Sequence, residues 1–395
     1  MNTNELIEAE DKYFINTFTR QPIVLDHGKG VKVWDKDGNE YIDMFAGIAV
    51  NALGHAHPKL VNALQGQVEK LIHVSNIYYN EPAIEYAKKL LPLTEFDRLF
   101  YANSGAEANE GAIKLALKYT GKSEIITAKD SFHGRTLLTL AATGHEEYRE
   151  PYLKNLPQGF IEVPYNDIEA IKEAISDETA AIMLEPIQGE GGVNTAPQGF
   201  SYLEEVRALC NQHNWLMMLD EIQTGNGRTG KYFAYQHTNI IPDVMTTAKG
   251  LGNGFPVGAV MTQGKAVGLL GAGSHGSTYG GTVLGSRVVY TVLDTLENEN
   301  AVENAAVVGA YIVDQLRAQL IDQNVQVRGF GMMIGVQLPK DCAELVAIAR
   351  DQYKLIINVT AGSVVRLLPP LNLTQAQADE LLKRLVPAIQ GFLAA

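Results

Sequence analysis

The sequence holds few cysteines, no long apolar run and no cluster of positive charge. Its two cysteines, Cys210 and Cys342, stand far apart and outside any paired spacing. Two such thiols give neither a disulfide framework nor a zinc-binding pair, so a secreted disulfide scaffold is excluded and a reducing compartment is favoured. No apolar run approaches the ~20 residues of a membrane span, and residues 1–13 are polar and acidic, unlike a secretory leader. We therefore expect a cytoplasmic protein with no membrane partner.

Negative charge outweighs positive charge, because 45 acidic residues face 32 basic ones and give a formal net charge of −13. A field of this sign repels nucleic acids and anionic membranes, so we expect no nucleic-acid partner. A small anionic ligand is still compatible, because a few arginines can make one pocket positive. The chain is 46% hydrophobic and 19% charged, which is typical of a soluble globular enzyme. Its 395 residues exceed what one core of about 250–300 residues supports.

Short apolar runs alternate with segments of helical periodicity through the middle of the chain. The strand candidates are residues 99–102, 124–128, 180–184, 215–219, 244–247 and 258–261. The helix candidates are residues 58–72, 81–91, 104–120, 167–175 and 201–213. This alternation predicts an α/β fold with a mostly parallel central sheet covered on both faces.

The two ends of the chain differ from this middle. Residues 31–39 predict a hairpin, with Asp37-Gly38-Asn39 as its turn. A long helical segment at about 286–320 precedes brief strands and two further helices, which is typical of a smaller α+β unit. We therefore predict three units, namely an N-terminal arm with strands that packs with the small domain (1–57), a large domain (58–285) and a small C-terminal domain (286–395).

Two glycine-rich loops follow strand candidates. In the first, Ser104 and Glu107 have the spacing of a helix cap, and Gly105 and Ala106 lie between them. Such a helix start presents free N–H groups that can hold an anion, although most caps of this kind bind nothing. The second loop, residues 225–230, matches G-x-G-x-x-G. Five residues separate it from its strand and no helix start follows, so we interpret it as a connection rather than a dinucleotide site.

A carboxylate and a lysine stand at the ends of two strand candidates. Asp220 directly follows an apolar run, where a carboxylate must be paired or solvated in a cleft. Lys249 follows the next run and precedes three glycines within five residues. It is either the end of a flexible surface loop or a partly desolvated amine whose lowered pKa makes it nucleophilic. Because strand carboxyl ends meet at the ligand crevice of an α/β sheet, we expect both residues to lie there.

This combination is what pyridoxal phosphate requires in an enzyme. A lysine forms an imine with the cofactor, a carboxylate keeps its ring nitrogen protonated, a helix start holds its phosphate and an aromatic side chain packs on the ring. Phe132, after residues 124–128, is a suitable aromatic, although it is equally suited to a plain core position. His55 and His57 lack a third ligand at a sensible spacing, so we predict no metal site.

Seven runs in chain order resemble the class III aminotransferases of fold type I, of the ornithine and acetylornithine type. The resemblance covers nearly the whole chain. The runs are GIAVNALGH (47–55), NSGAEANE (103–110), FHGRT (132–136), EPIQGEGG (185–192), LDEIQTG (219–225), TTAK (246–249) and HGSTYGG (275–281).

The resemblance implies a role for each matching position around pyridoxal phosphate. Lys249 should form the imine, Asp220 should pair with the ring nitrogen, and Gln223 should contact the phenolic oxygen. In the implied homodimer each active site needs both chains. The implied phosphate and ring contacts come from Ser104, Gly105, Ala106 and Phe132 and, from the partner subunit, Ser277 and Thr278.

The resemblance also implies how substrates bind. Arg135 is the expected clamp for a substrate carboxylate, and Arg366 with Glu190 resembles the switch that admits the α-carboxylate of 2-oxoglutarate. Phe18 stands where ornithine δ-aminotransferases have a tyrosine that meets the substrate's α-amino group, which favours an acylated amine. We expect the distal amine of N-acetyl-L-ornithine to pass to 2-oxoglutarate by a ping-pong mechanism, giving N-acetyl-L-glutamate 5-semialdehyde and L-glutamate.

Other activities compete with this expectation. Succinylornithine, ornithine and 4-aminobutyrate are alternative donors for the same class of enzyme. An aminomutase or decarboxylase would use the same cofactor, but the set Arg135, Glu190 and Arg366 argues against it, because a two-substrate enzyme needs two carboxylate modes in one pocket. A nicotinamide-binding protein built on residues 225–230 is a third hypothesis.

Overall fold

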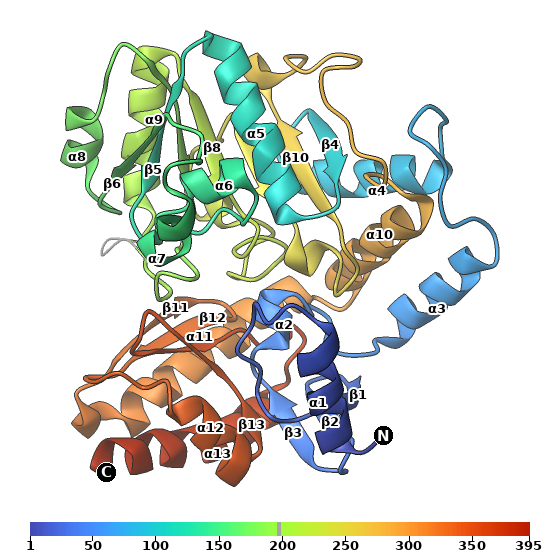
Figure 1. The fold of residues 1–395 in the computed structure, drawn as a ribbon, viewed down its shortest axis with the longest axis vertical. Coiled ribbons are helices and arrows are strands. Elements are labelled where there is room, and N and C mark those ends of the chain that lie inside the picture. The colour runs from blue at the N-terminus through green and yellow to red at the C-terminus, as the bar shows by residue number, and fades with distance from the viewer. Residues whose placement is uncertain (196–198) are drawn as a thin grey trace.

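The computed structural model describes residues 1–195 and 199–395, which form a larger and a smaller body, one above the other in Figure 1. The larger body contains a seven-stranded sheet with the order β4-β10-β9-β8-β7-β5-β6. Every strand runs parallel to its neighbours except β10, which is antiparallel to β4 and β9. The predicted α/β fold with a mostly parallel central sheet is therefore confirmed. The strands are β4 Arg98–Ala102, β5 Glu124–Ala128, β6 Phe160–Val163, β7 Thr179–Leu184, β8 Leu216–Asp220, β9 Val244–Thr247 and β10 Gly258–Thr262.

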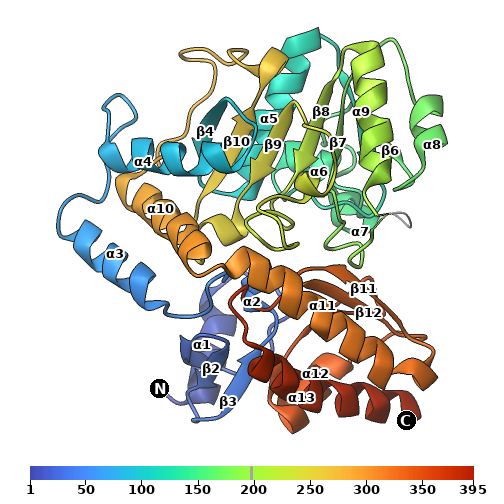
Figure 2. The same ribbon diagram turned by 180° about the vertical axis from the view of Figure 1, so that it is seen from behind.

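Helices cover both faces of this sheet (Figures 1 and 2). All five positions of β8 are buried. Because side chains alternate along a strand, Leu216 and Met218 pack with α5 (Gly105–Thr120), while Met217 and Leu219 pack in a second cluster with α9 (Ser201–His213). A run that is apolar at every position thus marks a strand buried on both faces.

The smaller body joins the two ends of the chain. Its antiparallel sheet has the order β11-β12-β15-β14, and the strands β1 to β3 near the N-terminus form a second sheet that ends on β13. β13 pairs in parallel with β3, with Leu355 opposite Ile42. The strands are β1 Leu25–Lys29, β2 Lys32–Asp35, β3 Glu40–Asp43, β11 Gln326–Phe330, β12 Met333–Gln337, β13 Leu355–Ile356, β14 Asn358–Thr360 and β15 Val364–Leu367.

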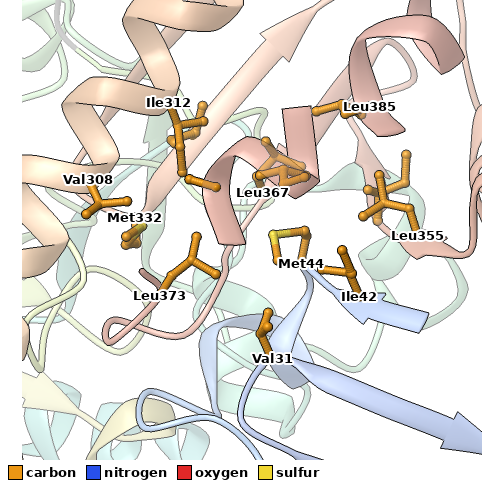
Figure 3. Packing of buried hydrophobic residues seen from close by; sticks show 14 of the residues in the cluster. Val31, Ile42, Met44, Val308, Ile312, Met332, Leu355, Leu367, Leu373 and Leu385 are labelled. Atoms are coloured by element: carbon orange, nitrogen blue, oxygen red, sulfur yellow. The ribbon is translucent and has the colours of Figure 1, made fainter. Parts of the chain in front are cut away.

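One apolar cluster holds this body together (Figure 3). Val31, Ile42 and Met44 from the N-terminal strands pack in it with Leu355 and Leu367 from the C-terminal third. Burial of such side chains contributes roughly 1.5–3 kcal/mol each. The predicted domain limits at 57/58 and 285/286 stay a prediction.

The predicted helical segment at about 286–320 is two helices. α10 (Val283–Asn298) ends before Asn300, whose φ of 50° turns the chain out of the helix, and α11 (Ala301–Gln319) follows. The remaining helices are α1 Thr3–Tyr13, α2 Ala46–Ala49, α3 Pro58–Val68, α4 Glu81–Leu90, α6 Leu137–Ala142, α7 Glu146–Arg149, α8 Ile168–Glu173, α12 Leu345–Tyr353 and α13 Gln375–Ala394. Within residues 1–195 and 199–395, no helix has the length and apolar character to cross a membrane.

Candidate active site

One cavity of about 460 Å³ lies at the carboxyl edge of the large sheet. Loops from the carboxyl ends of β4, β5, β7, β8 and β9 line it, together with the loop that leads into β10. In a parallel sheet these ends lie on one edge, which is where ligands bind. The cavity brings together most of the predicted site residues, namely Ser104, Gly105, Ala106, Phe132, Arg135, Asp220, Gln223 and Lys249.

The start of α5 faces this cavity. The Ser104 hydroxyl accepts a hydrogen bond from the N–H of Glu107 at 3.2 Å, as the sequence spacing predicts. The Glu107 carboxylate differs from the capping box, because it accepts from the N–H of Asn103 at 2.9 Å. A Cβ on Gly105 would lie 2.7 Å from Cδ1 of Ile222, so a larger residue there would displace the Ile222 side chain. The first N–H groups of a helix have no partner within it, so they are free to bind an anion such as a phosphate.

Asp220 ends β8 and is almost completely buried. Its Oδ2 atom accepts hydrogen bonds from Nδ1 of His133 and from the amide of Asn109, each at 2.8 Å, and Oδ1 accepts from the N–H of Ile222 at 3.0 Å. Oδ1 of Asn109 in turn accepts a hydrogen bond from the hydroxyl of Thr246 at 2.7 Å. The carboxylate is thereby fixed in place by neighbours on three different elements.

Sequence reasoning missed the roles of His133 and Asn109. Asn109 carries a signal that could have revealed it, because it lies on the same face of α5 as Ala108, Ala112 and Ala116 and is completely buried. A lone amide on an apolar helix face must have a polar partner inside the protein. His133 follows Phe132 directly, and nothing in the neighbouring sequence predicts that it hydrogen-bonds to Asp220.

Sequence reasoning also missed the role of Glu185, which directly follows β7. Its carboxylate accepts hydrogen bonds from the N–H of Phe132 at 2.9 Å and from that of Gly189 at 3.3 Å. Burial raises the pKa of Glu185 above its ordinary value, against the lowering effect of His133. Glu185 therefore holds the loop that presents Phe132 to the cavity.

Lys249 lies beyond β9 in a left-handed backbone conformation with a φ of 43°. Such a conformation is strained for a residue with a side chain and persists only where its surroundings enforce it. Here Asn226 donates to the hydroxyl of Thr247 at 2.8 Å and to the carbonyl of Ala248 at 3.1 Å. The Lys249 side chain is partly accessible from the cavity.

Burial lowers the pKa of the Lys249 amine. The charge of Glu190 opposes this shift and the charge of Arg366 adds to it. A larger share of the amine is thus unprotonated near neutral pH, and the unprotonated amine is the form that attacks a carbonyl carbon. Burial of the amine is what the expectation of a desolvated lysine requires, and the nucleophilic role of Lys249 stays a prediction.

Glu190 and Arg366 form a two-point ion pair beside the cavity. Nη1 of Arg366 lies 2.7 Å from Oε1 of Glu190, and Nη2 lies 3.1 Å from Oε2. Nη1 also donates to the side-chain oxygen of Gln223, a cavity residue, at 3.2 Å. Arg366 is only 1% exposed, whereas Glu190 is 21% exposed. Glu190 is therefore the partner with room to move.

Arg135 lies at the exposed mouth of the cavity. Its guanidinium stacks 3.5 Å above the ring of Tyr148 and 5.5 Å from that of Phe132. Cation–π contacts of this kind orient an arginine without neutralising its positive charge. Arg135 can thus hold an incoming carboxylate.

Three predicted residues, Ser277, Thr278 and Phe18, do not line the cavity within one chain. Ser277 accepts a hydrogen bond from the amide of Asn103 at 2.6 Å, and Thr278 is exposed. Phe18 is 72% exposed on the N-terminal arm, where it lines a groove against α1, and the Arg20 guanidinium lies 5.5 Å from its ring.

Comparison with known proteins identifies the family. The aminotransferase class-III profile matches residues 14–389. An acetylornithine aminotransferase from Methanothermobacter thermautotrophicus is 50% identical over 381 residues, which cover 96% of this chain and 97% of the relative. One from Methanocaldococcus jannaschii is 44% identical and covers 98% of both chains.

Solved structures give the same family. An ornithine aminotransferase from Toxoplasma gondii superposes with a TM-score of 0.94 at 30% identity, covering 99% of this chain and 96% of the other. An acetylornithine aminotransferase from Elizabethkingia anophelis has a TM-score of 0.88 at 34% identity, covering 99% of this chain and 100% of the other. The fold is that of a type I aminotransferase, and the chain belongs to the class III aminotransferases, which are enzymes that depend on pyridoxal phosphate.

Proposed function

We propose that this enzyme moves the distal amine of N-acetyl-L-ornithine to 2-oxoglutarate, giving N-acetyl-L-glutamate 5-semialdehyde and L-glutamate, a step of arginine biosynthesis. The observation that carries the proposal is the pair of guanidinium groups at one cavity, with Arg135 open at its mouth and Arg366 neutralised by Glu190. Relatives named acetylornithine aminotransferase at 44–50% identity over nearly the full chain support the choice of donor.

The cavity suits pyridoxal phosphate. The free N–H groups at Gly105 and Ala106 with the Ser104 cap would hold the phosphate, Phe132 would pack on the ring, Gln223 would contact the phenolic oxygen, and Asp220 would pair with the ring nitrogen. The bound cofactor supplies a carbonyl that takes up the amine and a ring that withdraws electrons. Lys249, with its lowered pKa, would take the proton from the substrate carbon that bears the amine and deliver it to the cofactor's carbonyl carbon.

The donor must be long and carry one carboxylate. Arg135 binds that carboxylate at the mouth, while the distal amine enters toward Lys249 at the far end of the donor. A guanidinium binds a carboxylate through two parallel hydrogen bonds and so fixes its orientation. Acylation of the α-amine removes a positive charge that would otherwise lie near Arg135.

The acceptor carries a second carboxylate next to the reacting carbon. With Glu190 paired to Arg366, the cavity offers one free guanidinium and suits the acylated donor. When Glu190 moves aside, Arg366 binds the α-carboxylate of 2-oxoglutarate and Arg135 binds the γ-carboxylate. One pocket thereby serves both halves of a ping-pong reaction.

We also propose a cytoplasmic homodimer in which Ser277 and Thr278 reach the phosphate of the partner's site. Large apolar side chains are exposed near both the 275–281 run and the N-terminal arm, as expected of a surface that a second copy covers. They are Phe14, Ile15, Ile77, Tyr78, Tyr79 and Tyr279.

Substrate specificity decides between the proposed donor and its rivals. We expect kcat/KM for N-acetyl-L-ornithine to exceed that for ornithine and 4-aminobutyrate, measured with 2-oxoglutarate under one set of conditions. Succinylornithine is the nearest rival, since a pocket open enough for acetyl can admit a longer acyl group. Faster turnover of ornithine or 4-aminobutyrate than of both acylated donors would overturn the proposal. Isomerisation of a single amino acid without an acceptor would instead indicate an aminomutase.

A further inference from the structure

Arg366 has an asparagine beside it on the sheet of the smaller body. Asn358 on β14 lies directly opposite Arg366 on β15, and Gly335 on β12 lies opposite Arg366 on the other side. A Cβ on Gly335 would lie 3.0 Å from that of Val193, so that side of the arginine is closed to a larger residue. Asn358 is thus the cross-strand side chain that meets Arg366.

All five N–H groups of Arg366 have acceptors in this arrangement. Oδ1 of Asn358 accepts from Nε at 3.0 Å and from Nη2 at 2.8 Å. Glu190 takes one N–H from each of Nη1 and Nη2, and Gln223 takes the other N–H of Nη1. Each acceptor holds a different part of the guanidinium: Asn358 holds the Nε side, Glu190 covers the edge between Nη1 and Nη2, and Gln223 takes the outer N–H of Nη1.

The same strand also holds the backbone of Glu190. The Thr360 hydroxyl donates to the Glu190 carbonyl, and residues two apart on a strand share a face. β14 therefore anchors the guanidinium through Asn358 and the main chain of its counterion through Thr360. The Glu190 side chain can then rotate away while its backbone and the arginine stay in place.

We propose that Asn358 is a positioning residue that sets specificity for the α-carboxylate of 2-oxo acids. It keeps the Nη1–Nη2 edge of Arg366 directed at the cavity after Glu190 withdraws. Because its amide is neutral, it leaves the full positive charge of the guanidinium for the incoming α-carboxylate. An aspartate in its place would keep Arg366 neutralised. This inference rests on the proposed function, in which Arg366 binds only those substrates whose carboxylate adjoins the reacting carbon.

Comparing two amino donors, glutamate and acetylornithine, distinguishes a positioning role of Asn358 from a purely structural one. Glutamate carries its α-carboxylate next to the transferred amine and needs Arg366, whereas the carboxylate of acetylornithine lies several bonds away. In Asn358→Asp and Asn358→Leu we expect KM for 2-oxoglutarate and for glutamate to rise about tenfold or more, as for loss of a hydrogen bond to a charged group. KM for acetylornithine and kcat should stay within about twofold.

The measurements are steady-state kcat and KM for each substrate, with single-turnover half-reactions on the cofactor-loaded enzyme and competition by glutarate as a non-reacting dicarboxylate. Asn211→Asp adds the same charge on the exposed side of α9 and should change none of these constants. If Asn358→Leu does not fold, Asn358→Asp, which keeps an acceptor oxygen, carries the test. Equal losses with glutamate and acetylornithine, or an unchanged KM for 2-oxoglutarate, would overturn the inference. A parent enzyme that does not transaminate acetylornithine would instead overturn the proposed function.

Discussion

Nδ1 of His133 lies 2.8 Å from Oδ2 of Asp220, and both side chains are buried at the carboxyl edge of the large sheet. Burial alone lowers the pKa of His133, but the hydrogen bond and the charge of Asp220 oppose it and raise the pKa overall. The imidazole therefore keeps its proton over a wider pH range. A protonated imidazole beside the carboxylate compensates the cost of burying that charge.

Replacing Asp220 tests its proposed role as the partner of the cofactor's ring nitrogen. We expect Asp220→Asn to keep the cofactor but to lose about a hundredfold or more in kcat, because a neutral amide does not stabilise a protonated ring nitrogen. The measurements are kcat and cofactor content from the visible absorbance. The matched control is Asp243→Asn, a buried aspartate paired with Arg207 at 2.7 Å just before β9. That variant should lose stability rather than turnover per bound cofactor. Activity of Asp220→Asn within a few-fold of the parent would remove the assigned role.

Much of the large sheet was predictable because its strands are short, buried runs of mostly apolar residues. β5 and β9 have the predicted limits, and β8 differs from its prediction by one residue at each end. A run buried on both faces is mostly apolar, so the sequence alone reveals it. Asp220, which ends β8, and Lys249, which lies two residues beyond β9, stand out for a related reason, because a charge after an apolar run must be paired or solvated.

Long-range placement was not predictable from local patterns. The break at Asn300 depends on one left-handed residue within an otherwise helical stretch, and helical periodicity does not report a single φ. The bond from Asn109 to Asp220 joins residues 111 positions apart, and the periodicity of α5 does not say which strand it crosses. Phe18 lies on an exposed arm, where no apolar pattern specifies its neighbours.

Lys249 is expected to be essential for amine transfer. Lys249→Ala should lose turnover and the visible band of the covalently held cofactor, because the variant lacks both the amine and the proton carrier. The phosphate cradle at Gly105 and Ala106 is untouched, so cofactor binding by itself should survive. Lys265→Ala is the control, because Lys265 also has a pKa lowered by burial but donates to the carbonyl of Trp215 away from the cavity. Near-normal turnover of Lys249→Ala would contradict the assignment.

Thr278 is expected to act across subunits. Thr278→Ala should lose activity in its own dimer, since the partner's phosphate loses a hydroxyl donor. Mixed with inactive Lys249→Ala chains, it should regain activity, because one of the two sites in a heterodimer then has an intact set. The measurement is activity after verified subunit exchange, with each parent assayed alone. Thr262→Ala, at the far end of β10, is the control and should stay active without mixing. Absence of recovery between two inactive parents would argue against a shared site.

The last prediction concerns Glu221, which is completely buried next to Asp220. Its carboxylate accepts hydrogen bonds from the Thr224 hydroxyl and from the N–H groups of Ala234 at 2.9 Å and Tyr235 at 2.8 Å. Burial raises the pKa of Glu221 to about 7 from an ordinary 4.5, although these hydrogen bonds lower it. Between these two pH values the folded protein keeps a proton that the unfolded chain has released.

The free energy of unfolding should therefore fall as pH rises from 4.5 to 7, by up to about 1.4 kcal/mol per pH unit from this group. Above that window both states are ionised, and below it both are protonated. Glu221→Gln cannot titrate, so its stability should fall less between pH 5 and pH 8 than that of the parent, measured by urea unfolding of the cofactor-free chain. Glu204→Gln, on the exposed side of α9, makes the same chemical change and should follow the parent. Parallel stability curves for the parent and Glu221→Gln would show that Glu221 is ionised in the fold throughout, held there by its three hydrogen-bond donors.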